Sequence, residues 1–268
     1  MSDRLAIIAG GGGLPAALAE ADPGALCIAF EGAEVALPET RVTRHRMERL
    51  GDLFDALNAE GVTRVVMAGA MARPSFDPAL LDVTTTGLLP HLMAAMQQGD
   101  DHLLCFVISM FEERGFTVIG VADVLPDLTA EAGLLAGEAP TATARSDIAR
   151  GRDILEALSP HDVGQGCVIG AGLCLGIETL QGTNALLRFV GDTPAHLRRD
   201  GGGVLIKRPK TGQDLRVDMP AIGPDTIRAA AAAGLDGIAI AAGAVLIIDR
   251  PAVLSLCRDH GLFLLAEP

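Results

Sequence analysis

The sequence predicts an α/β protein, with a parallel-sheet domain at the amino end followed by a second, smaller-sheet α/β domain. Segments with strand character are continuously apolar, segments with helical spacing separate them, and 49% of the 268 residues are apolar. Continuously apolar strands that alternate with helices indicate a parallel sheet covered on both faces. The length suits two modest domains, because single domains most often run about 100 to 150 residues.

The first predicted domain spans 1–130. It opens with a strand at 5–9, a glycine loop at 10–13 and a helix at 14–21, where Pro15 lies in the first turn and needs no N–H. A helix with one buried face is indicated further on by the spacing of Leu50, Leu53, Phe54 and Leu57. The remaining predicted elements are strands at 26–30, 63–68 and 116–121 and helices at 88–97 and 103–113.

Between 122 and 145 the alternation of strand and helix patterns is lost, and the sequence is rich in Ala, Gly, Pro, Thr and Glu. This composition predicts a linker or crossing arm, which we assign to 131–146. A second domain at 147–268 follows. Its predicted helices are 148–158, 184–190, 226–233 and 252–260, and its predicted strands are 166–170, 173–179, 204–207, 237–240, 245–248 and 263–265.

Composition and charge exclude several classes of protein. The formal charge of −13, with eight Phe and neither Trp nor Tyr, argues against a nucleic-acid partner. The start lacks the length and flanks of a signal peptide, and no apolar run reaches the length of a membrane helix, so we expect a cytoplasmic protein. The five cysteines are widely spaced and lie mostly inside apolar runs, which predicts reduced, buried thiols.

The glycine loop is the first candidate binding element. Gly11-Gly12-Gly13-Leu14-Pro15-Ala16 fits the pattern G-x-G-x-x-A directly after a strand and at the start of a helix, which indicates a Rossmann-like phosphate site. Glu31 follows where a ribose-binding carboxylate would lie in a dinucleotide fold. A tight turn between strand and helix also needs glycine. Both interpretations stay open.

The second element is Gly99-Asp100-Asp101-His102, between two predicted helices. Its simplest interpretation is a helix cap, because Asp is favoured at the start of a helix and Gly at the end of the preceding one. Adjacent carboxylates can also bind a hydroxyl-bearing substrate or a metal.

The third element is the most informative, because the chain has only two lysines among its 21 Lys and Arg residues. Both fall in Lys207-Arg208-Pro209-Lys210, and the loop continues through Gln213 and Asp214 to Asp218. Ammonium groups suit phosphate oxygens, and carboxylates beside phosphates need a shared divalent cation. A solvated loop with accidental ion pairs is the alternative. The six scattered histidines show no zinc-binding spacing.

The order of these motifs resembles one family along nearly the whole chain, the LpxI-type UDP-2,3-diacylglucosamine pyrophosphatases. The resemblance rests on six short segments, 8–15, 99–104, 182–184, 207–213, 217–223 and 234–250. It implies hydrolysis of UDP-2,3-diacylglucosamine to UMP and 2,3-diacylglucosamine 1-phosphate (lipid X) in lipid A biosynthesis. It also implies a requirement for Mg²⁺ or Mn²⁺ and an active site in the cleft between two domains.

The resemblance assigns roles to residues of this chain. Asp218 matches the carboxylate on which catalysis in the family depends, and we expect it to bind metal or to orient water. Lys207, Lys210 and Gln213 match the element that contacts phosphate, with Lys207 and Gln213 taken as catalytic. The substrate-binding residues are then Gly11, Gly12, Gly13, Leu14, Asp100, Asp101, Thr183, Asn184, Lys210 and Gly223.

Two positions depart from the family pattern. Asn184 and Ala241 stand where the family commonly has acidic residues. We take Asn184 as an acceptable oxygen donor and Asp214 as a substitute carboxylate and second metal ligand.

Two rival functions remain at this stage, a nucleotide-dependent (NAD-type) oxidoreductase and a non-catalytic protein that binds a phosphorylated lipid. The acylated substrate implies transient contact with the inner-membrane surface, so the cytoplasmic protein would be peripheral to that membrane. The sequence leaves the oligomeric state open, including a homo-oligomer.

Overall fold

The computed structural model describes residues 3–71, 76–198 and 202–268. The chain divides into two compact units, of which the first holds 1–126 together with 216–218 and the second holds 127–215 and 219–268. Within the described ranges, no helix combines the length and the apolar composition needed to cross a membrane.

The first unit is built on a five-stranded, fully parallel sheet in the order β3-β2-β1-β4-β5. Its strands are β1 (Arg4–Ala9), β2 (Leu26–Phe30), β3 (Val42–His45), β4 (Val62–Ala68) and β5 (Thr117–Ile119). Its helices are α1 (Leu14–Ala21), α2 (Leu50–Ala59), α3 (Val83–Gln98), α4 (Asp100–Glu112) and α5 (Val121–Val124). The order reverses between β1 and β4, where doubly wound sheets commonly bind ligands beyond the carboxyl ends of the strands.

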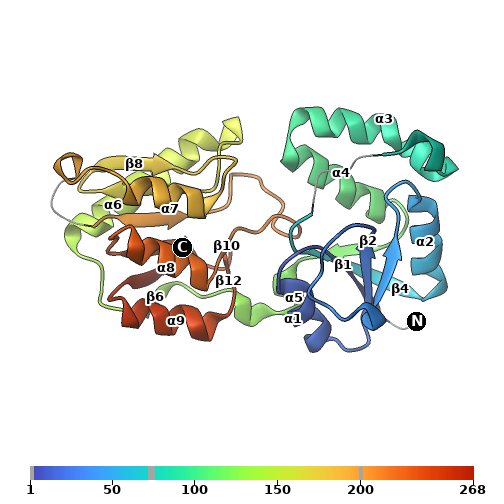
Figure 1. The fold of residues 1–268 in the computed structure, drawn as a ribbon, viewed down its shortest axis with the longest axis horizontal. Helices are drawn as coiled ribbons and strands as arrows, with labels where there is room; N and C mark the ends of the chain where they lie inside the picture. Colours follow the sequence, from blue (N-terminus) through green and yellow to red (C-terminus); the bar gives the residue numbers. More distant parts are fainter. Residues whose placement is uncertain (1–2, 72–75, 199–201) are drawn as a thin grey trace. The chain divides into compact units, whose positions relative to one another are not determined.

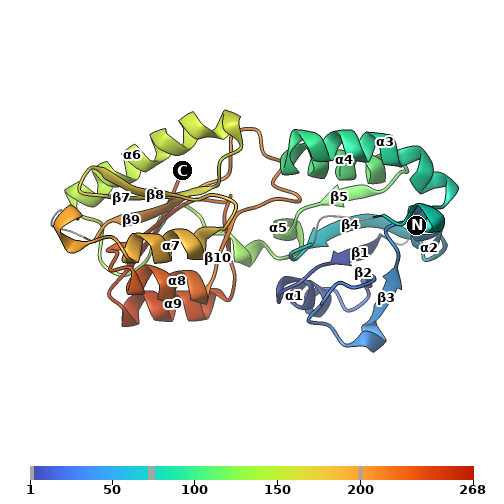
Figure 2. The ribbon, with the colours of Figure 1, turned by 45° about the horizontal axis from the view of Figure 1, so that its top comes forward.

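Both faces of this sheet are covered, as continuously apolar strands require. Helices α2 and α4 pack on one face and form a core around Phe54, Phe111 and Phe116. Helices α1 and α5 contact the sheet through β1 and β4, and α3 packs against α2 and α4 (Figures 1 and 2). The predicted parallel-sheet domain is therefore confirmed.

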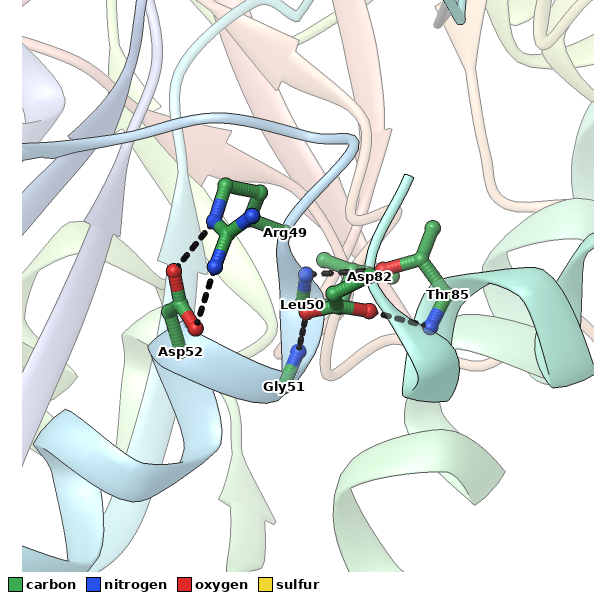
Figure 3. A network of polar contacts seen from close by, with 6 residues as sticks. All are labelled: Arg49, Leu50, Gly51, Asp52, Asp82 and Thr85. Atoms are coloured by element: carbon green, nitrogen blue, oxygen red, sulfur yellow. Dashed lines mark hydrogen bonds and ion pairs between the residues drawn. The ribbon is translucent and has the colours of Figure 1, made fainter. Parts of the chain in front are cut away.

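One carboxylate holds the starts of two helices of this unit together. Asp82 is the N-cap of α3, and its side chain accepts the N–H of Thr85 at 2.6 Å and the N–H of Gly51, in the first turn of α2, at 2.7 Å (Figure 3). The hydroxyl oxygen of Thr85 accepts the N–H of Leu50 at 2.9 Å. Four orphan amides at the start of a helix need such acceptors, and here two neighbouring helices share them.

The second unit is a three-layer α/β structure on a mixed, six-stranded sheet in the order β6-β13-β11-β9-β7-β8. Its strands are β6 (Gly133–Ala136), β7 (Gly166–Gly170), β8 (Leu173–Ile177), β9 (Val204–Lys207), β11 (Gly237–Ala241) and β13 (Phe263–Glu267), with a separate pair, β10 (Ala221–Ile222) and β12 (Leu246–Ile247). Its helices are α6 (Ala142–Leu158), α7 (Thr183–Gly191), α8 (Pro224–Ala232) and α9 (Arg250–Asp259). Helix α6 covers one face, and α7, α8 and α9 cover the other (Figure 2).

Three expectations need correction. The second sheet was expected to be the smaller, yet it has six strands against five in the first among the described residues. The segment 131–146, expected to be a linker, contains the edge strand β6, which pairs antiparallel with β13, and the start of α6. The cysteines were expected to be buried, but Cys105 and Cys174 are exposed.

Candidate active site

Lys207 lies in a buried polar cluster of the second unit. It is the last residue of β9, and only 5% of its surface is exposed. Its Nζ donates to Thr183 Oγ1 at 2.5 Å and lies 3.4 Å and 3.3 Å from the two carboxylate oxygens of Glu178. The Thr183 hydroxyl in turn donates to Glu178 Oε1 at 2.8 Å. The three side chains therefore form one closed network, which we call the Lys207 cluster.

Glycines make room for this cluster. Gly166 lies opposite Lys207 in the antiparallel register of β7 and β9, and a Cβ on Gly166 would lie 2.7 Å from Glu178 Oε2. Gly164 has a φ of +53°, and a Cβ there would lie 2.1 Å from the carbonyl oxygen of Glu178. Side chains at either position would displace Glu178, so the sequence around β7 is fitted to that residue.

The second lysine is also paired inside its own unit. Lys210 forms an ion pair with Asp162, and only 14% of the Lys210 side chain is exposed. The side-chain oxygen of Gln213 accepts the N–H of Lys210 at 2.8 Å, and the N–H of Thr211 donates to Ser159 Oγ at 2.6 Å. These bonds hold the loop after β9 against the end of α6. Both lysine side chains are therefore held in place by specific partners. This arrangement argues against the alternative interpretation of a solvated loop with accidental ion pairs.

The segment 216–218 packs with the first unit although its neighbours in sequence belong to the second. Arg216 Nη1 donates to Glu112 Oε1 at 2.7 Å and lies 3.4 Å from the carbonyl oxygen of Val118. Val217 packs against the apolar core that α2 and α4 form. Asp218 is half-buried at the end of this segment. The proposed catalytic carboxylate is thus attached to the amino-terminal unit, which the sequence did not indicate.

The glycine turn is shaped partly by a close approach between two loops. The N–H of Gly11 donates to the carbonyl oxygen of Ala70 at 2.8 Å, so it is already engaged. A Cβ on Gly10 would lie 2.4 Å from the same oxygen. By contrast, a Cβ on Gly13 would meet no atom within 4 Å, and Gly13 has an ordinary φ of −84°. Close packing therefore explains why position 10 is a glycine. It does not explain the glycine at position 13, which points to another cause, such as a ligand that approaches the backbone.

The acidic pair before α4 is the start of a helix. Gly99 is the N-cap with a φ of +117°, and Asp100 and Asp101 begin α4, where acidic side chains interact favourably with the helix dipole. The cap is therefore the glycine instead of an aspartate. Asp101 is half-buried, and the side chain of Asp100 lies outside the described part of the structure.

Two more predicted binding residues lie at helix starts of the second unit. Thr183 and Asn184 begin α7 after Gly182, whose φ is +79°. Gly223 is the N-cap of α8, and its N–H donates to Thr226 Oγ1 at 3.3 Å. The Thr183 hydroxyl belongs to the Lys207 cluster, whereas Asn184 is exposed.

A hollow of about 340 Å³ lies at the start of α7, with both polar and apolar side chains in its lining. It is lined by Ile177, Thr179, Gln181 and Gly182 before α7 and by Ala185, Leu186 and Phe189 on α7. Leu180, in the same loop, is 91% exposed, and Phe189 is 66% exposed. Large apolar side chains exposed together often mark a surface that binds an apolar ligand.

No group of three or more His, Cys, Asp or Glu side chains that could hold a metal ion occurs among the described residues. The two carboxylates expected from the sequence to bind metal, Asp214 and Asp218, are both half-buried, and they belong to different units. Each supplies carboxylate oxygens, the donors that Mg²⁺ takes, and proteins usually bind Mg²⁺ through one or two carboxylates together with substrate phosphates and waters.

Comparison with known proteins decides the family. The sequence model of the LpxI N-terminal domain matches residues 4–128, and that of the LpxI C-terminal domain matches residues 131–265. The chain belongs to the LpxI family. A relative from Caulobacter vibrioides, the UDP-2,3-diacylglucosamine pyrophosphatase LpxI, is 38% identical over 280 residues that cover 98% of this chain and 96% of the relative.

Family membership does not favour the NAD-type interpretation of the glycine loop. The Glu31 carboxylate, expected to bind a ribose in that case, lies 2.9 Å from Arg46 in an exposed ion pair. Glu178, Glu112 and Arg216 were not among the predicted functional residues of this LpxI protein. The lysine that pairs with Glu178 lies 29 residues away, and Glu112 and Arg216 are 104 residues apart, so no local spacing could have indicated these ion pairs.

Proposed function

We propose that the chain hydrolyses UDP-2,3-diacylglucosamine to UMP and 2,3-diacylglucosamine 1-phosphate, a step of lipid A biosynthesis. The observation that carries the proposal is the 38% identity, over nearly the whole of both chains, to a relative of that name. Water adds across the pyrophosphate: its oxygen bonds to one phosphorus, the bond from that phosphorus to the bridging oxygen breaks, and a proton is released. Such a reaction needs positioning and charge neutralisation rather than a covalent nucleophile.

Asp218 is assigned to the reacting water or to the metal, with Asp214 as the second metal-binding carboxylate. When bound, Mg²⁺ or Mn²⁺ would neutralise charge on the diphosphate oxygens. Lys207, Lys210 and Gln213 are assigned to the diphosphate. Fixed donors and charges are what phosphoryl transfer requires, and both ammonium groups are held by carboxylates of their own unit.

The residues proposed to bind substrate lie at the starts of helices and in glycine turns. For the glycine turn, the amides of Gly12, Gly13 and Leu14 are the proposed donors, because the N–H of Gly11 is engaged by Ala70. The start of α1 adds a favourable dipole for a phosphate. The open space around Gly12 and Gly13 supports this assignment. The interdomain cleft stays a prediction, as do the roles of Asp100, Asp101, Asn184 and Gly223.

We assign one acyl chain of the substrate to the hollow beside α7. The apolar side chains in its lining, together with the exposed side chains of Leu180 and Phe189, support this assignment. The same side chains would meet the hydrocarbon of the inner-membrane surface when the substrate is taken up, which makes the cytoplasmic protein peripheral to the membrane.

The test is UMP release from UDP-2,3-diacylglucosamine by the purified full-length chain, with Mg²⁺, with Mn²⁺ and with a chelator. We expect equal amounts of UMP and 2,3-diacylglucosamine 1-phosphate with metal and no release with chelator. Asp218→Ala should lower kcat far more than it raises KM, because the carboxylate acts mainly in the transition state.

Other outcomes would point to the rival functions. Tight binding of the lipid product without UMP release under either metal would make the chain a phospholipid-binding protein. NAD binding without UMP release would favour the oxidoreductase. Full turnover by Asp218→Ala would remove that residue from the catalytic assignment.

A further inference from the structure

The buried pair of Lys207 and Glu178 is costly for the protein to keep. The side chains are only 6% and 11% exposed, so both charges have lost most of their hydration. The mutual attraction of such a pair often fails to offset this loss, and apolar residues of similar volume are commonly as stable or more stable in its place. The pair is therefore poor evidence for a purely stabilising role.

The surroundings show that the arrangement is tightly specified. Glu178 follows β8, Thr183 begins α7 and Lys207 ends β9, so three elements meet at the cluster. Both oxygens of Glu178 face the ammonium, and the Thr183 hydroxyl bridges the two charged groups. Gly166 lacks the Cβ that would collide with the carboxylate. The Lys207 ammonium therefore meets partners from the end of β8 and from the start of α7.

We propose that Glu178 is a positioning residue, which fixes the Lys207 ammonium and the Thr183 hydroxyl at the start of α7. Its effect on turnover rests on the proposed pyrophosphatase function, but its effect on Lys207 does not. Glu178 acts through the other two side chains and makes no contact with substrate in this role. Without its carboxylate, the ammonium loses its counter-charge and the hydroxyl loses its acceptor, so both groups move.

The first test measures Lys207 directly. The chain has only two lysines, so amine modification with formaldehyde and borohydride, followed by peptide mass spectrometry, reports Lys207 and Lys210 separately. In the wild type we expect Lys207 to be modified more slowly than Lys210. In Glu178→Gln the rate at Lys207 should rise about tenfold relative to Lys210, as expected when a buried ion pair opens. An unchanged ratio would overturn the proposal, whatever the protein's activity.

The second test separates kcat from KM for UMP release. Glu178→Gln should lower kcat by about 100-fold with little change in KM, because a displacement of about 1 Å at a reacting group has an effect of that size. Full turnover by a folded Glu178→Gln variant would overturn the proposal. If the wild type itself releases no UMP, the proposed function fails, while the modification experiment still decides the role of Glu178.

The matched control is Asp147→Asn, another buried carboxylate of the same unit. Asp147 is 3% exposed and accepts the N–H groups of Ala171 and Gly172 in the turn between β7 and β8, away from the cluster. The substitution Asp147→Asn should lower the melting temperature but leave kcat, KM and the rate of Lys207 modification unchanged. If Asp147→Asn changed kcat and Lys207 modification as much as Glu178→Gln does, Glu178 would contribute only to general stability. That result would overturn the proposal.

A double variant covers the case in which Glu178→Gln does not fold. Glu178→Met with Lys207→Met removes both charges together, and we expect a melting temperature no lower than that of the wild type, with UMP release lost. A markedly unstable double variant would mean that the pair is kept for stability, and this too would overturn the proposal.

Discussion

Arg216 and Glu112 form an ion pair with 2.7 Å between Nη1 and Oε1, although 104 residues separate them in the chain. Glu112 is the last residue of α4, and Arg216 lies two residues before Asp218. Together with the packing of Val217 on the core of the first unit, the pair fixes the segment that carries the proposed catalytic carboxylate. A surface ion pair can thus serve placement where its contribution to stability is small.

We predict that Glu112→Gln separates activity from stability. The two side chains are 38% and 43% exposed, so the free energy of unfolding should change by no more than about 1 kcal/mol. Turnover should fall about tenfold or more, because Asp218 is then held less firmly. Denaturant unfolding and UMP release measure the two effects. Glu60→Gln breaks a comparably exposed pair with Arg4 and should leave turnover unchanged. Equal turnover in both variants would contradict the placement role.

Asp82 caps two helices, so we predict that it contributes more to the free energy of unfolding than a surface ion pair does. Asp82→Ala removes the acceptor for amides of two helices, α2 and α3, and should lower the free energy of unfolding by about 2 kcal/mol, since one cap contributes about 1 kcal/mol. Asp52→Ala, which breaks the neighbouring exposed pair with Arg49 (Figure 3), should lower the free energy of unfolding by clearly less, because exposed ion pairs contribute little to stability. Similar losses in the two variants would show that Asp82 caps only one helix.

The contribution of Asp82 should also depend on pH. Burial alone would raise the pKa of this carboxyl, but hydrogen bonds from Thr85, Gly51 and Asp52 outweigh burial and lower the pKa below its usual 3.8. A lowered pKa in the folded state means that the stabilisation is fully present above pH 3.8 and is lost as the pH falls through the folded value. The difference in unfolding free energy between wild type and Asp82→Ala should therefore shrink below about pH 3.8. A difference that stays constant down to pH 2 would contradict the shift.

Much of the fold could be predicted because most strands are short apolar runs and most helices show one buried face. The strands β1, β2, β7 and β9 are examples. The prediction missed β3 and β6, which lie at the edges of their sheets. The sequence of β3, Val-Thr-Arg-His, is largely polar, and β6 lies within a segment rich in Gly and Ala, so neither shows the pattern of a central strand.

The candidate site was predictable only where residue type itself is informative. Two lysines three positions apart, in a chain that otherwise uses Arg, drew attention to 207–210. Glu178 carries no such signal, because one Glu in Ile177-Glu178-Thr179 looks like a solvated residue at a strand end. Its burial depends on Lys207, Thr183 and Gly166, which only the folded chain brings together.

The cysteines should differ sharply in reactivity. Burial raises the pKa of Cys167 to about 12 and that of Cys257 to about 11, and Cys27 is only 1% exposed. Because the thiolate is the reactive form, iodoacetamide at pH 8 should modify Cys105 and Cys174 in the native protein and the other three only after denaturation. Peptide mass spectrometry reads each site. Rapid native modification of Cys167 would contradict its burial against α6.

The acyl-chain assignment predicts an effect that depends on chain length. Leu180→Ser and Phe189→Ser should each raise KM about tenfold for the natural diacyl substrate, since burying such a side chain contributes about 1.5 kcal/mol or more. KM for an analogue with short acyl chains should not change. Val83→Ser is the control, because Val83 is 92% exposed, as Leu180 is 91% exposed, but lies on α3 of the other unit. An equal rise in KM for both substrates would place the acyl chain elsewhere.

Gly13 gives the sharpest test of phosphate contact at the glycine turn. A Cβ there meets no protein atom within 4 Å and the φ is ordinary, so Gly13→Ala should change the free energy of unfolding by less than about 1 kcal/mol. The added methyl group would occupy space that an approaching phosphate needs, and KM should rise. Gly10→Ala, whose Cβ would lie 2.4 Å from the carbonyl oxygen of Ala70, should instead destabilise the fold. Unchanged kinetics in Gly13→Ala would mean that the turn needs its glycines for the chain alone, and that the substrate binds without it.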